Sequence, residues 1–291
     1  MSYRKTSSHL VVFLISLLLS GCAQSKLISF DGANSIKYIE KQIEYGPRIP
    51  GSDGSNAVRE LIRTELESTG WEVENQNFIF DHKDLTNIIA KSSNNPPKII
   101  IGAHYDTRAI SDNESSPSQQ VIPVPGANDG ASGTAVLLEL GRVLSREEFD
   151  IWLIFFDAED QGNIGIWEWS IGAQYFVDQL NFTPDYVIIV DMIGDKSLEI
   201  YKENYSDTLL VNSIWYEAEI LGYGSYFIQD YKYSIIDDHL PFIENGISAC
   251  LIIDLDYPYW HTTEDTLDKV SGNSLEIVGK VLISWLSNHA R

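Results

Sequence analysis

Four short, uninterrupted apolar runs constrain the fold of this 291-residue chain more than any other feature. They lie at residues 99–101, 151–156, 187–190 and 250–253. Such runs are typical of central strands that helices cover on both faces. Helical patterns alternate with them at 133–145, 171–179, 208–221 and 274–288. The alternation predicts an α/β protein with three α/β/α layers and a mostly parallel, mixed central sheet.

The chain upstream of the first run predicts two helices and two strands. Helical spacing is expected at 33–42 and at 56–69, where Gly70 provides a natural stop. Strand patterns follow at 71–80 and 85–91, and the polar stretch 111–120 is expected to be a mobile surface loop. The length fits one domain better than two, so we expect residues 33–291 to form a single catalytic domain.

The first residues have the pattern of an export signal. Arg4 and Lys5 precede an apolar stretch at 11–19, which is too short to span a membrane as a mature helix. Leu19-Ser20-Gly21-Cys22 follows and resembles the lipobox of bacterial lipoproteins. The resemblance implies a signal peptide at 1–21, a lipidated Cys22, and a tether at 22–32. We therefore expect a lipid-anchored protein of the bacterial cell envelope, facing the periplasm or the cell exterior. An ordinary secretory signal is the alternative.

Charge and cysteine content narrow the range of partners. The formal net charge is −22 and no basic cluster offsets it, so we expect no nucleic-acid partner. We expect contact with the membrane through the lipid anchor only. Cys250 is the only cysteine besides Cys22, which leaves no intramolecular disulfide in the mature chain.

Imidazole and carboxylate side chains follow the apolar runs. In an open α/β sheet the carboxyl ends of the strands meet at one crevice, where ligands bind. The residues expected there are His104, Asp106, Asp157, Glu159, Asp160, Asp191 and His261, with Asp129 in a small-residue loop that opens a helix. Each acid alone could be a helix cap or a solvated loop residue. Together they would repel one another unless a cation lay among them, and zinc suits nitrogen and oxygen ligands.

The same residues carry a resemblance to a known family. Five motifs occur in the same order as in the M28 family of zinc aminopeptidases and in the related animal-type glutaminyl cyclases. They are His104-Tyr105-Asp106, Gly126-Ala127-Asn128-Asp129, Phe156-Asp157-Ala158-Glu159-Asp160, Asp191-Met192-Ile193-Gly194 and His261-Thr262-Thr263-Glu264-Asp265-Thr266. The resemblance implies the zinc exopeptidase fold, of the phosphorylase/hydrolase-like type, and one or two Zn²⁺ ions per chain.

The resemblance also implies a role for each residue. His104 and Asp191 correspond to ligands of one zinc, Asp160 and His261 to ligands of the other, and Asp129 to the bridge between them. Glu159 corresponds to the general base, and Asp106 to a carboxylate that orients His104. Most members carry Glu where this chain has Asp160, which is one methylene shorter.

Two reactions remain open at this point. An aminopeptidase would remove residues from peptides with a free amino terminus, and a cyclase would convert amino-terminal Gln to pyroglutamate. Because all five ligand positions are filled, the sequence leans towards hydrolysis. Asp237 favours cyclisation, since aminopeptidases usually carry Ser at this position. The residues expected to contact substrate are Trp167, Trp169, Trp260 and His239. A non-catalytic binding domain is a third, less favoured interpretation.

Overall fold

The computed structural model describes Met1 and residues 29–144, 146 and 148–289. The predicted signal peptide and Cys22 lie outside the described residues. No helix in the described ranges combines the length and apolar character needed to cross a membrane.

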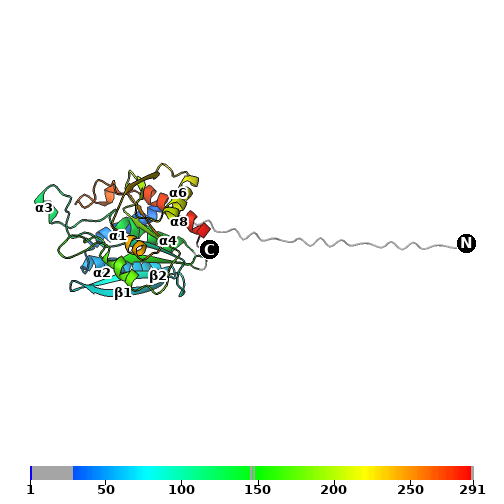
Figure 1. The fold of residues 1–291 in the computed structure, drawn as a ribbon, viewed down its shortest axis with the longest axis horizontal. Helices are drawn as coiled ribbons and strands as arrows, with labels where there is room; N and C mark the ends of the chain where they lie inside the picture. Colours follow the sequence, from blue (N-terminus) through cyan, green and yellow to red (C-terminus); the bar gives the residue numbers. More distant parts are fainter. Residues whose placement is uncertain (2–28, 145, 147, 290–291) are drawn as a thin grey trace.

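A six-stranded sheet forms the centre of the domain (Figure 1). Its strands, in spatial order, are β1 (Glu72–Phe80), β2 (Lys83–Lys91), β4 (Ile151–Phe156), β3 (Ile99–His104), β5 (Tyr186–Asp191) and β8 (Ala249–Ile253). The pairs β4–β3, β3–β5 and β5–β8 are parallel, whereas β1 and β2 form an antiparallel edge. The four apolar runs are therefore four parallel neighbours, as predicted.

Helices cover both faces of this sheet. One face packs against α1 (Gly32–Glu44), α2 (Asp53–Ser68), α4 (Ala131–Val143), α6 (Thr208–Ile220) and α8 (Gly272–His289). The other face packs against α5 (Ile171–Asp178) and α7 (Leu240–Glu244). Strand side chains alternate between the two cores: Ile101 lies in the first and Ile100 in the second. This arrangement confirms the three-layer α/β/α fold.

Five elements were not expected from the sequence. β6 (Ile200–Glu203) and β7 (Phe227–Tyr233) form a separate parallel ribbon. The other three are the short helical segments α3 (Pro117–Gln120), α7 and η1 (Leu267–Lys269). β7 is largely exposed and polar, so it lacks the apolar run that revealed the central strands. The folded part also begins before residue 33, because Phe30 is buried and Asp31 caps α1.

The stretch 111–120 lies mostly at the surface, as predicted, while its mobility stays a prediction. Ser111 is buried; its N–H donates to the carbonyl oxygen of Gln120 (3.1 Å), and its hydroxyl donates to that of Ile122 (2.8 Å). Polar groups in this stretch therefore form hydrogen bonds within the domain. The segment that contains them lies beside the candidate site.

Candidate metal centre and active site

The polar residues that follow the parallel strands converge at one edge of the sheet. His104 ends β3 and Asp191 ends β5, while Asp160 lies in the turn after β4. Asp129 precedes α4, and His261 lies in the segment after β8. All five side chains are buried, with exposed fractions between 1% and 7%. The spatial convergence that the sequence predicted is present.

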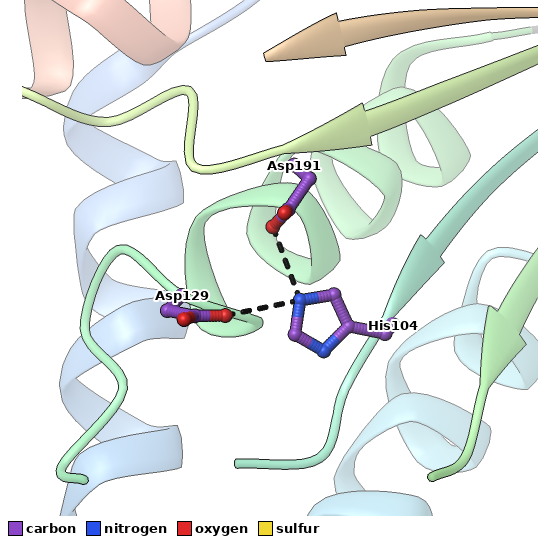
Figure 2. A group of neighbouring side chains, drawn as sticks. All are labelled: His104, Asp129 and Asp191. Atoms are coloured by element: carbon purple, nitrogen blue, oxygen red, sulfur yellow. Dashed lines mark hydrogen bonds and ion pairs between the residues drawn. The ribbon is translucent and has the colours of Figure 1, made fainter. Parts of the chain in front are cut away.

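His104, Asp129 and Asp191 form one potential metal-binding group (Figure 2). The Nε2 atom of His104 lies 3.0 Å from Asp191 Oδ1 and 3.2 Å from Asp129 Oδ1. The opposite ring nitrogen, Nδ1, lies 3.3 Å from Asp106 Oδ1. Asp106 thus contacts His104 on the side facing away from this group.

Asp129, Asp160 and His261 form a second group that shares Asp129 with the first. The Nε2 atom of His261 lies 3.0 Å from Asp160 Oδ1 and 3.8 Å from Asp129 Oδ2. The two groups match the two ligand sets that the family resemblance implied, including the shared aspartate.

The donor atoms of the second group fit a bound cation. Asp129 Oδ2, both carboxylate oxygens of Asp160 and His261 Nε2 are buried without a hydrogen-bond partner. Buried polar atoms without partners are costly, and a divalent cation would satisfy all of them at once. One imidazole nitrogen with carboxylate oxygens is a donor set that zinc accepts.

Asp106 also holds the turn that follows β4. Its two carboxylate oxygens accept hydrogen bonds from the backbone N–H groups of Glu159 (3.0 Å) and Asp160 (3.3 Å). Ala158, just before them, has a φ of 58°, a conformation that few non-glycine residues adopt. One buried carboxylate therefore orients His104 and fixes the backbone of Glu159 and Asp160.

Two residues that hydrogen-bond to the backbone of Asp129 were not predicted from the sequence. Arg48 is fully buried, and its guanidinium donates to the carbonyl oxygens of Tyr105 (2.9 Å), Gly126 (2.6 Å) and Asp129 (3.3 Å). Asp265 accepts from the backbone N–H of Asp129 at 3.1 Å. Asp265 belongs to the His261–Thr266 motif, which was a usable signal. Arg48 lies in a Gly/Pro-dense stretch that predicted only a loop.

A cavity of about 320 Å³ opens onto the second group. Its lining consists of Asp129, Glu159, Asp160, Trp169, Asp191, Met192, Ser234, Ile235, Ile236, Asp237, Ile253, Leu255, Trp260 and His261. Burial raises the pKa of Glu159 well above its ordinary value, and the nearby carboxylates of Asp237 and Asp238 raise it further. Glu159 is thus a strong proton acceptor when ionised, which suits a general base.

Two of the three tryptophans predicted to bind substrate line the cavity, and one does not. Trp169 and Trp260 line the cavity, and the Trp169 ring is stacked near the His261 ring with a centroid distance of 6.0 Å. Trp167 does not line it: its ring packs edge-on against Phe80 in a separate apolar cluster. Trp167 and Trp169 are separated by one residue, and the sequence could not show which faced the cavity.

His239 also lies outside the cavity lining. It is fully buried, and its Nε2 atom lies 3.1 Å from Glu203 Oε2, at the end of β6. The pairing of His239 with Glu203 could not be predicted from the sequence, because β6 was not predicted. The structure therefore pairs His239 with Glu203 rather than placing it in the cavity lining, and its contact with substrate stays a prediction.

A mostly parallel α/β/α sheet with two buried His/Asp groups at its edge defines the class of zinc exopeptidases and their relatives. The profile described as peptidase family M28 matches residues 87–286. The chain belongs to this family. It is an enzyme with zinc as its cofactor.

Relatives in this family carry two activities in their names. A leucine aminopeptidase precursor from Bacteroides thetaiotaomicron VPI-5482 has a TM-score of 0.84 and 32% identity, covering 91% of this chain and 99% of that one. Glutaminyl cyclase from Porphyromonas gingivalis has a TM-score of 0.84 and 31% identity, covering 90% and 99%. The glutaminyl-peptide cyclotransferase of Boiga irregularis is 26% identical over 81% of this chain and 75% of its own length.

Proposed function

We propose that this enzyme is a glutaminyl-peptide cyclotransferase, which converts amino-terminal Gln to pyroglutamate. The supporting observation is the position of Asp237, which lines the same cavity as Glu159 and His261. Aminopeptidases usually carry Ser at this position. Cyclisation needs one zinc ion, and Asp129, Asp160 and His261 supply a set of donor residues for it at this cavity.

The proposed reaction places both proton transfers on Glu159. Its carboxylate takes a proton from the substrate's α-amine, whose nitrogen then bonds to the γ-carboxamide carbon. The bond from that carbon to the amide nitrogen breaks, and Glu159 returns the proton to the departing ammonia. Zinc, when bound by Asp129, Asp160 and His261, supplies Lewis-acid polarisation of the γ-carbonyl oxygen.

Asp237 complements Glu159 in this scheme. Burial raises the pKa of Asp237 well above its ordinary value, and the charges of Asp191 and Asp238 add to the rise. A raised pKa extends the pH range in which Asp237 carries its proton. In that form the carboxyl group can donate a hydrogen bond to an acceptor oxygen of the substrate or to the carboxylate of Glu159.

The walls of the cavity indicate which peptides fit. Ile235, Ile236 and Leu255 are apolar, and no Lys or Arg is among the lining residues. An acidic residue directly after the amino-terminal Gln would meet carboxylates and no basic side chain among the lining residues, so it should bind poorly. Peptides with an apolar second residue are the preferred substrates in this proposal.

The test is a direct comparison of products. We expect the zinc-loaded enzyme to convert a Gln-anilide to its pyroglutamyl form, with ammonia released, and to leave a Leu-anilide intact. Mass spectrometry separates pyroglutamyl product from released amino acid, and metal analysis of the same sample counts ions. Free leucine together with two zinc ions per chain would replace this proposal with the aminopeptidase.

Aminopeptidase activity is the second candidate, and one observation favours it. Both metal-binding groups have a complete set of donor residues, including His104 and Asp191. In that reaction Glu159 would take a proton from water and pass it to the leaving amine.

For cellular location, we propose export and lipid anchoring at Cys22. The support is the sequence Leu19-Ser20-Gly21-Cys22 behind a basic and apolar leader. Several acyl chains on one cysteine would anchor the protein stably, because a single chain binds only marginally. Labelled palmitate should appear in the wild-type protein and be absent from Cys22→Ser; equal labelling of both would contradict the proposal.

A further inference from the structure

The segment 111–120 is docked onto the residues that surround His261. The backbone N–H of Asn113 donates to the carbonyl oxygen of His261 (3.2 Å), and its side-chain amide donates to that of Trp260 (3.1 Å). Thr263 donates its backbone N–H (3.0 Å) and its hydroxyl (2.6 Å) to Glu114 Oε1. The segment is therefore hydrogen-bonded to His261 and to residues before and after it in the chain, Trp260 and Thr263.

His261 requires such support because of its backbone conformation. Its φ is 56°, in the left-handed region that non-glycine residues rarely occupy. A residue persists there only when its surroundings determine its conformation. The hydrogen bonds from 111–120 supply part of that determination.

Asp112 connects this segment to the His261 ring. Its Oδ1 atom lies 3.1 Å from His261 Nδ1, on the opposite side of the ring from the nitrogen that faces Asp160. Arg108 holds the same carboxylate with two bonds, Nε to Oδ1 at 2.9 Å and Nη2 to Oδ2 at 2.5 Å.

Arg108 is held in place by contacts with residues of the site. Its guanidinium donates to the carbonyl oxygens of Asp160 (3.2 Å) and Gly162 (3.1 Å), and it lies over the Trp169 ring, 5.0 Å from the centroid. It is 2% exposed. Arg108, Asp112 and His261 thus form a continuous line of contacts that ends at the imidazole.

We propose that Asp112 is the positioning residue of His261. It accepts a hydrogen bond from Nδ1–H, which fixes the tautomer and the ring orientation and leaves Nε2 free for zinc. Each histidine then has its own orienting carboxylate, Asp106 for His104 and Asp112 for His261. The inference rests on His261 as a zinc ligand and holds for either reaction.

The test compares zinc affinities by competition with a chelator. Asp112→Asn should bind zinc about 10- to 100-fold more weakly than the wild type. The metal-free variant should have the same melting temperature as the metal-free wild type. Glu114→Gln is the matched control: it removes another negative charge from the same segment, but its amide oxygen can still accept from Thr263. This control should retain wild-type affinity.

A double-mutant cycle separates a role through His261 from a general effect of charge. His261→Ala alone should lose zinc affinity, which tests the ligand assignment by itself. Adding Asp112→Asn to that background should cause no further loss, because the ring on which Asp112 acts is gone. A full additional loss would overturn the inference.

Four other results would also overturn it. Unchanged zinc affinity in Asp112→Asn would show that the contact is dispensable. An equal loss in Glu114→Gln would assign the effect to charge. An Asp112→Asn protein that fails to fold even in excess zinc would show that the segment serves folding instead. If His261→Ala retains zinc affinity, the metal assignment fails, and the inference fails with it.

Discussion

Glu159→Gln should lower kcat by about 10²- to 10⁴-fold, the range that a positioned general base contributes. The amide has nearly the same shape as the carboxylate but cannot take up the proton. The hydroxyl of Ser170, 3.3 Å from Glu159 Oε1, can still donate to an amide oxygen, so the side chain should stay in place. Steady-state kinetics on the preferred substrate, with metal analysis and melting temperature of the same samples, checks this result.

The control for this variant is Glu65→Gln. Glu65 is paired with Lys41 on the surface, away from the residues that line the cavity, and such pairs contribute little to stability. Its kcat should match the wild type. A Glu159→Gln enzyme with undiminished kcat would contradict the assignment of the base, whichever reaction the enzyme performs.

Removal of zinc should abolish turnover and destabilise the fold. At a zinc concentration 1,000 times the dissociation constant, binding adds about 4 kcal/mol to the free energy of unfolding. For a domain of this size that corresponds to a melting temperature roughly 8–16 °C higher than without metal. One equivalent of zinc should restore full activity. Undiminished turnover after complete chelation would refute the prediction.

The metal-free protein should also lose stability as the pH rises. Burial raises the pKa of Asp254 to about 7 and that of Asp265 to about 7. In the unfolded chain these carboxyls lose their protons near pH 4, so between pH 4 and 7 the folded state holds more protons. The free energy of unfolding therefore falls across that range. Urea unfolding at pH 5, 6 and 7 measures it, and a rise would contradict it.

The parts of the fold visible in the sequence were those with a strong hydrophobic period. The strands β3, β4, β5 and β8 were visible because parallel strands buried on both faces consist almost entirely of apolar residues. The β6–β7 ribbon lacked this signal: β7 exposes most of its residues, and β6 has only four. Local pattern therefore revealed the core and missed the periphery.

The site residues were likewise predictable only where they follow strands with a clear hydrophobic pattern. His104, Asp160 and Asp191 could be placed together because each follows a strand of one parallel sheet, whose carboxyl ends meet. Asp112 could not, since it lies in a polar stretch without period and contacts a residue far along the chain. The side chain of Trp167 was misplaced for a similar reason. The sequence predicted the strands β1 and β2, but it did not show that Trp167 would pack against their side chains.

The first described residues of the domain bear on how the enzyme meets its substrates. Phe30 packs so closely on α8 that a Cβ atom at Gly279 would lie 2.3 Å from its ring. Figure 1 shows α8 and α3 at opposite ends of the domain, and the segment with α3 adjoins Trp260 at the cavity. Eight residues from Cys22 to Phe30 reach roughly 29 Å at most. If Cys22 is acylated as proposed above, this tether would keep the α8 end of the domain within about 29 Å of the bilayer surface.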